Sequence, residues 1–104
     1  MKNSSLTNII GTCCQLKRVE NMKRETATWE KNPAHDFLLW QDQQMLDELT
    51  KELSEELLSN GWGFSEVGDF LDKLRDFAYM DENKDALVLE IKKWVSKAEQ
   101  MAAA

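Results

Sequence analysis

The stretch SNGWGFSEVGDF, residues 59–70, separates two segments of helical apolar periodicity with a short glycine-containing corner. Asn60 or Gly61 can adopt the left-handed conformation that ends a helix. Ser65 suits the start of the next helix, because its side chain can accept a backbone hydrogen bond there and acids follow it. A corner this short makes the two helices antiparallel neighbours, so this stretch sets the course of the chain.

Apolar residues recur at helical spacing on both sides of the corner and indicate four helices. We expect the first from about Ser5 to the mid-twenties, the second from Pro33 with Asn32 as its N-cap, the third from Ser65, and the fourth from 81–83. We therefore predict an all-α fold, a small antiparallel helical bundle of about four helices. The apolar stripes are Leu6, Ile9, Ile10, Cys13 and Leu16; Leu39, Leu46, Leu49, Leu53 and Leu57; Val67, Phe70, Leu71, Leu74, Phe77 and Ala78; and Leu87, Val88, Ile91, Trp94, Val95, Ala98 and Met101.

The whole chain, 1–104, is expected to be a single helical domain, since its length suits one core. Residues 33–100 form the three-helix body. Residues 1–32 form an N-terminal helix and linker whose apolar stripe drifts, because Val19 and Met22 fall on another side than the earlier apolar residues. This helix could pack on the body or exchange with a second copy, which leaves a homodimer open.

Charge is unevenly distributed along a chain of net charge −6. Residues 1–32 hold six Lys/Arg and three Glu, whereas residues 33–104 hold seven Lys/Arg and sixteen Asp/Glu. An acidic body repels a phosphate backbone, so we expect no direct nucleic-acid binding and favour a basic protein partner. The apolar runs are too short to span a membrane and the first residues are too polar for a secretory signal, so we expect a cytoplasmic protein.

The two cysteines, Cys13 and Cys14, are adjacent. Neighbouring residues on a helix point about 100° apart, so a disulfide between them would be strained. We expect reduced thiols, buried or at the edge of the core. A redox or metal role has little support, because there is no second cysteine pair and the only histidine, His35, is distant in sequence.

Two pairs of acids flank the corner: Glu52 and Glu55 near the end of the second helix, and Glu66 and Asp69 at the start of the third. In two antiparallel helices, their angular offsets from the apolar stripes put both pairs on the same edge. Carboxylates of this kind are the ligands that Mg²⁺ prefers. A solvated acidic edge is the simpler interpretation, because a helix N-terminus favours acids.

The motifs ELSE at 52–55 and EVGD at 66–69 resemble the metal site of the all-α nucleoside triphosphate pyrophosphohydrolases, the MazG-like family. That family has E-x-x-E on one helix and E-x-x-D on the next. The resemblance implies that the four acids hold Mg²⁺, which would activate water and neutralise phosphate charge. The reaction it implies is release of pyrophosphate from a nucleotide.

Aromatic residues supply the other indication of function. Trp62 and Phe64 lie in the corner, and Trp40 lies at the flank of its stripe. The corner rings could cap the end of the core, or they could anchor a partner, because tryptophan is frequent at binding hot spots. We interpret the chain as a non-enzymatic protein-binding module, an adaptor, inhibitor or accessory factor without cofactor or catalytic residue, with Trp40, Trp62 and Phe64 as contacts. The alternative is the Mg²⁺-dependent pyrophosphohydrolase.

Overall fold

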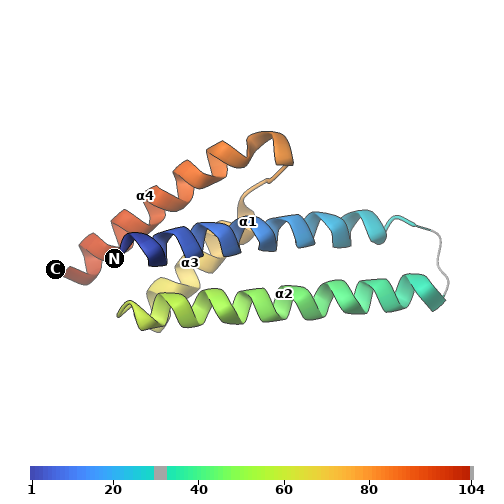
Figure 1. Ribbon diagram of the computed structural model, residues 1–104, viewed down its shortest axis with the longest axis horizontal. Coiled ribbons are helices and arrows are strands. Elements are labelled where there is room, and N and C mark those ends of the chain that lie inside the picture. Colours follow the sequence, from blue (N-terminus) through green and yellow to red (C-terminus); the bar gives the residue numbers. More distant parts are fainter. Residues whose placement is uncertain (30–32, 104) are drawn as a thin grey trace.

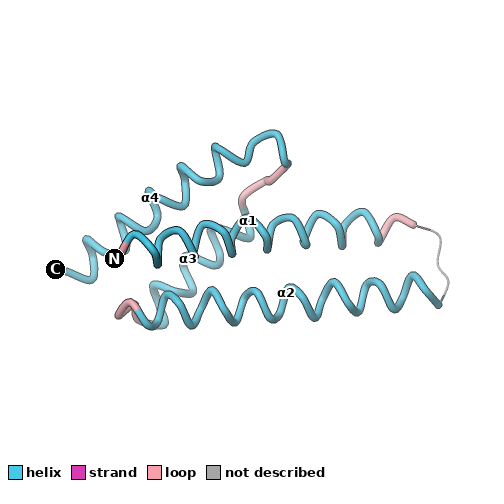
Figure 2. The backbone as a smooth tube through the Cα atoms, in the orientation of Figure 1, coloured by secondary structure: helices cyan, strands magenta, loops and turns pink. Residues whose placement is uncertain are grey.

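The computed structural model of the chain describes residues 1–29 and 33–103. Its helices follow in the order α1 (Asn3–Thr26), α2 (Pro33–Ser59), α3 (Phe64–Asp76), the short 3-10 helix η1 (Asp81–Asn83) and α4 (Lys84–Ala103) (Figure 1). No strand occurs among the described residues, and the predicted all-α fold is confirmed (Figure 2). The helix α2 begins at Pro33 as predicted, whereas Asn32, its expected N-cap, lies outside the described residues. Within the described residues, no helix is long and apolar enough to cross a membrane.

The helices α1 and α2 pair as an antiparallel hairpin, which is the most extensive contact between helices. The helix α3 crosses one face of this hairpin and α4 runs obliquely beside it, both over the half that contains the N-terminus (Figure 1). The other half projects without a covering helix, and we call residues 22–29 and 33–42 the arm. The arm elongates the molecule to 52 × 26 × 22 Å, with a Cα radius of gyration of 15.1 Å, against about 13 Å for a compact chain of this length.

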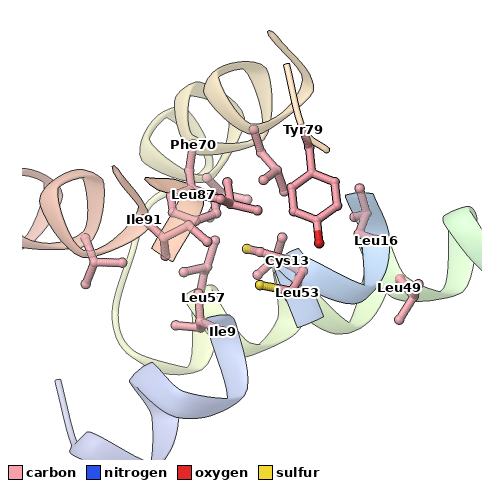
Figure 3. Packing of buried hydrophobic residues seen from close by; sticks show 14 of the residues in the cluster. Ile9, Cys13, Leu16, Leu49, Leu53, Leu57, Phe70, Tyr79, Leu87 and Ile91 are labelled. Carbon is pink, nitrogen blue, oxygen red and sulfur yellow. The ribbon is translucent and has the colours of Figure 1, made fainter. Parts of the chain in front are cut away.

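The hydrophobic core lies where the hairpin meets α3 and α4 (Figure 3). The helix α1 is buried on more than one side, since Cys13, Cys14 and Val19 are all buried although they point in different directions. This explains the drift of its apolar stripe and shows that α1 packs within its own chain. The buried apolar residues are Ile9, Cys13, Cys14, Leu16, Val19, Leu49, Leu53, Leu57, Trp62, Val67, Phe70, Leu74, Tyr79, Leu87, Ile91 and Val95.

Three residues of the predicted stripes lie outside the core, and one of them is Leu39, a partly exposed residue of the arm. Ala78 is exposed, because α3 ends at Asp76 and the chain continues with extended backbone at Phe77. Met101 is also exposed, near the end of α4. The predicted periodicity is therefore correct within the helices and fails where a helix ends or leaves the core.

The corner between α2 and α3 is a Schellman motif. Gly61 has a φ of 88°, the left-handed conformation predicted for the end of α2. The amide of Trp62 donates to the carbonyl of Leu57 at 3.3 Å, and the amide of Gly61 donates to that of Leu58 at 3.0 Å. These two bonds define this kind of helix end, and they direct the residue after Gly61 back toward α2.

The helix α3 begins one residue before Ser65, at Phe64, and its N-cap is Gly63. The prediction of Ser65 as N-cap was wrong, since Ser65 lies inside the first turn of α3. The carboxylate of Glu66 lies close to Gly63. A Cβ atom at Gly63 would lie 2.5 Å from Glu66 Oε2, so glycine leaves room for this approach. The acid thereby lies at the positive end of the α3 dipole, which stabilises it.

Candidate functional site

The ring of Trp62 belongs to the core and is only 5% exposed. It meets Phe70 edge-to-face with ring centroids 5.8 Å apart, and Phe70 meets Trp94 in the same way at 5.7 Å. Phe77 extends this row of rings, with its centroid 6.4 Å from that of Trp94. The interpretation of Trp62 as a cap on the core fits this arrangement, and its ring does not offer a surface contact to a partner.

The other two predicted contact residues, Phe64 and Trp40, are exposed at opposite ends of the molecule. Phe64, beside the corner, is 83% exposed. Trp40, on the arm, is 58% exposed and stacks on Phe37 with centroids 6.0 Å apart and an interplanar angle of 28°. Phe37 follows the buried His35 by two positions, and a step of two turns a helical side chain by about 200°. The stacked pair therefore lies on the side of α2 that faces away from α1.

The surroundings of the Phe37–Trp40 pair are acidic. Asp47 lies seven positions after Trp40, which places it on the same side of α2 two turns away. The pair thus forms an apolar centre with negative charge around it and no neighbouring cation on its own helix. Between residues 36 and 50, α2 contains no Lys or Arg and three exposed acids, Asp36, Asp47 and Glu48, whereas Asp42 is buried.

The interior of the arm is polar, in contrast to the core. His35 Nε2 lies 2.6 Å from the carbonyl oxygen of Thr26, and the imidazole donates this bond because a carbonyl can only accept. Lys23 Nζ donates to Gln43 Oε1 at the base of the arm. Hydrogen bonds thus join the two helices of the arm, and most of its large apolar residues face solvent.

The structure does not bring the four predicted metal ligands together. Glu66 and Asp69 line one pocket between α3 and α4, whereas Glu52 and Glu55 do not reach it. Glu55 instead lies 4.0 Å from Lys51 on its own helix. Among the described residues, no group of three or more His, Cys, Asp or Glu is placed to hold a metal ion.

The pocket beside Glu66 and Asp69 has a volume of about 290 Å³. Trp62 and Trp94 contribute aromatic walls, and Lys73 and Lys97 contribute positive charge, as part of a lining that includes the two acids. The indole Nε1 of Trp62 is buried and has no hydrogen-bond partner among the residues that the structure describes. Because the lining holds charges of both signs, it selects neither an anion nor a cation.

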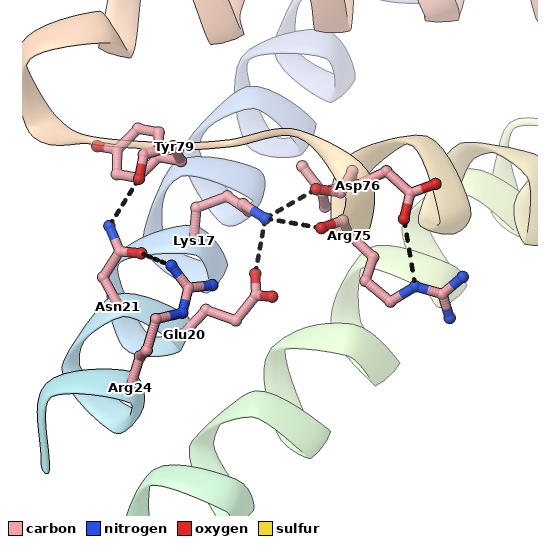
Figure 4. A network of polar contacts seen from close by, with 8 residues as sticks. Lys17, Glu20, Asn21, Arg24, Arg75, Asp76 and Tyr79 are labelled. Atoms are coloured by element: carbon pink, nitrogen blue, oxygen red, sulfur yellow. Dashed lines mark hydrogen bonds and ion pairs between the residues drawn. The ribbon is translucent and has the colours of Figure 1, made fainter. Parts of the chain in front are cut away.

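Lys17 is a buried cation that the sequence analysis did not single out (Figure 4). Its Nζ donates to the carbonyl oxygens of Leu74 at 2.9 Å and Arg75 at 3.3 Å, and it forms an ion pair with Glu20 at 2.8 Å. These carbonyls belong to the last turn of α3, where a cation complements the helix dipole. Lys17 therefore fastens α1 to α3. The only signal in the sequence is its position next to Leu16 on the buried side of α1.

Cys13 and Cys14 are free, buried thiols. Burial raises the pKa of Cys13, and the neighbouring Cys14 adds to this effect. Burial also raises the pKa of Cys14, although nearby Lys84 and Arg18 oppose the rise. The thiolate is the reactive form of cysteine, and a raised pKa disfavours it. Cys13 and Cys14 therefore contribute to packing and are not reactive thiols.

Comparisons with protein-family models, with curated proteins and with solved structures found no match for this chain. The resemblance to the MazG-like family rests on the two short motifs at 52–55 and 66–69. The structure adds a different feature, the exposed Phe37–Trp40 pair on the arm, and this pair is the strongest candidate for a functional surface.

Proposed function

We propose that this protein is a non-enzymatic protein-binding module and that the stacked Phe37–Trp40 pair is the centre of its contact surface. The supporting observation is that two large rings stack on each other in solvent, on a helix whose other side is already paired with α1. Aromatic residues account for much of the binding energy at protein interfaces, and exposed apolar patches with polar rims mark such sites.

The partner that fits this surface has an apolar pocket or ridge bordered by Lys or Arg. The acids of α2 around Trp40 repel acidic surfaces and attract basic ones, which speeds encounter and sets orientation. Binding through such a rim weakens as salt screens the charges. An adaptor, an inhibitor or an accessory factor would use the surface in this way, with Trp40 as its main contact.

A photo-reactive amino acid at Gln44, one turn from Trp40, tests this proposal in the full chain. Cross-linking in cells should yield a defined adduct, and the partner identified from it is then purified and titrated against the protein. Trp40→Ala should weaken that binding by about tenfold or more. Phe64→Ala is the matched control, because it removes an exposed aromatic ring from the other end of the molecule and should leave the affinity unchanged.

The absence of any adduct at Gln44, or an unchanged affinity after Trp40→Ala, would overturn the proposed function. The Mg²⁺-dependent hydrolase is the alternative that the motifs at 52–55 and 66–69 suggest, and it has a separate test. Pyrophosphate release from a panel of nucleoside triphosphates with Mg²⁺, lost in Glu52→Gln, would establish that activity in place of the binding module.

A further inference from the structure

We infer that a second copy of this chain docks on the face of the α1–α2 hairpin that lies opposite α3. This face differs from the Phe37–Trp40 surface, because Trp40 lies about 140° around α2 from Met45 at its centre. The inference therefore does not depend on the proposed function.

The position of this face follows from the residues under α3. Glu20 of α1 and Gln43 and Asp47 of α2 line a cavity together with residues of α3. A step of two residues turns a helical side chain by about 200°. Met22 therefore points away from the α3 side of α1, and Met45 points away from the α3 side of α2.

Apolar side chains occupy this face although no α-helix covers it. Residues 78–82 border its α1 edge, where they line a cavity with Arg18 and Met22. Met22 is 53% exposed and Met45 is 42% exposed. Leu38, also exposed, lies seven positions before Met45 and so on the same side of α2. The spacing of seven is that of helices that pack side by side in a bundle, with these residues as the contact line.

Charge selects a second copy as the occupant. On this face α1 presents Arg18, about 40° around the helix from Met22, and α2 presents Glu48, about 60° around the helix from Met45. Both side chains are exposed, whereas Lys17 and Asp42 are buried. Hydrogen bonds from His35 to the Thr26 carbonyl and from Lys23 to Gln43 show that α1 and α2 lie side by side in the hairpin. Each copy thus offers one basic and one acidic side chain on this face, which a self-complementary two-fold interface can pair.

A two-fold axis parallel to the hairpin satisfies both the apolar and the charged groups. It places α1 of one copy beside α2 of the other, so every neighbouring pair in the resulting four-helix bundle is antiparallel. Met22 then lies level with Met45 of the second copy, and Arg18 lies level with Glu48. Arg18 has room for this contact, because its side chain is 57% exposed although it lies 3.7 Å from Asp81.

Sedimentation equilibrium of the full chain tests the inference, from low to high micromolar concentration and at low and high salt. We expect a dimer that weakens as salt is added. Met45→Glu should weaken it by about tenfold or more. Leu89→Glu is the matched control, because Leu89 is 60% exposed on α4 and lies outside the proposed face. Circular dichroism should show that both variants keep their helices.

A charge exchange makes the test specific to contacts between copies. Arg18→Glu and Glu48→Arg should each weaken the dimer, whereas an equimolar mixture of the two variants should associate more tightly than either alone, because opposite charges then meet at both contacts. A monomer at every concentration overturns the inference. So does a dimer that Met45→Glu leaves intact, or a mixture that associates no better than its components.

Discussion

The two ends of the molecule use tryptophan in opposite ways. At the corner end, Trp62 and Trp94 join Phe70 in edge-to-face contacts within the core. On the arm, Trp29 and Trp40 are exposed, and hydrogen bonds hold the two helices together. Both ends are built from the same hairpin, so the difference lies in whether α3 and α4 cover it.

This contrast separates stability from binding. The covered end packs Trp62, Phe70 and Trp94 together and pairs the buried Lys17 with carbonyl oxygens, so most of the free energy of unfolding is expected there. The arm has polar groups inside and apolar groups outside, an arrangement that contributes little to folding and leaves apolar surface for association. The predictions below test this division, beginning with the largest expected effect.

Replacing Trp62 by alanine should reduce the free energy of unfolding by about 3–5 kcal/mol, because it removes a buried ring and its contact with Phe70. Urea denaturation followed by circular dichroism measures this. Trp62→Phe should cost clearly less, since it keeps an aromatic ring in the core. A loss below about 1 kcal/mol for Trp62→Ala would show that the ring is not part of the core.

Replacing Lys17 by methionine should reduce stability by about 2–3 kcal/mol, because the carbonyls of Leu74 and Arg75 and the carboxylate of Glu20 lose their buried partner. The same denaturation assay applies. Lys51→Met is the control, because Lys51 is exposed and its removal should change stability by no more than about 0.5 kcal/mol. Equal effects of the two variants would show that Lys17 does not join α1 to α3.

Removing the imidazole of His35 should loosen the arm and leave the core intact. His35→Ala breaks the bond to the Thr26 carbonyl, and we expect a local loss of about 1 kcal/mol. Hydrogen exchange should then speed up in residues 22–29 and 33–42, while the amides of α3 keep their protection. Faster exchange throughout the chain would instead show that arm and core open as one unit.

Alkaline pH should destabilise the core end through its thiols. Burial raises the pKa of Cys13 in the folded chain, whereas in the unfolded chain the thiol titrates near pH 8.5. The folded state therefore keeps the thiol proton to a higher pH than the unfolded state does. The contribution of Cys13 to the free energy of unfolding is complete below about pH 8.5, and above that pH it falls by at most about 1.4 kcal/mol per pH unit. Urea denaturation between about pH 8 and 10 should show this slope, and Cys13→Ala should make it shallower while Cys14 still contributes.

The fold followed from the sequence because local signals agreed with one another. The leucine stripe of α2, Gly61 at its end and Pro33 at its start all predicted the same helix, and the structure has it. The N-cap of α3 was misplaced to Ser65, because glycine has no side chain to signal its role at Gly63. The carboxylate of Glu66 lies close to Gly63 only in the folded chain, so the sequence alone does not show it.

The candidate site was harder to predict because it depends on which helix covers which. In the sequence, Trp62 lies in a corner and Trp40 at the flank of a stripe, and neither position shows whether the ring is buried. The packing of α3 and α4 buries Trp62 and leaves Trp40 exposed. Lys17 was missed for the same reason, since its partners are carbonyl groups 57 and 58 positions away. Phe37 is a candidate contact residue because its ring stacks on Trp40. A spacing of three residues on a helix allows this stacking but does not require it, so the sequence did not predict it.

The smallest expected effect is on the arm. Trp40→Ala should change the free energy of unfolding by no more than about 0.5 kcal/mol, because most of the ring is already in water when the protein is folded. It should nevertheless remove part of the fluorescence that iodide quenches and leave that of Trp29, since these two rings are exposed and Trp62 is shielded in the core.

The comparison of Trp40→Ala with Trp62→Ala decides whether the two ends differ as described. A large loss of stability from Trp40→Ala would mean that the exposed stack helps to hold α2 in place, so its exposure could not be taken as a sign of binding. A negligible loss, together with weaker binding to the partner found at Gln44, would separate the two roles within one molecule. Stability would then depend on the covered end and recognition on the uncovered one, because the same aromatic side chain contributes to folding only where another helix removes it from water.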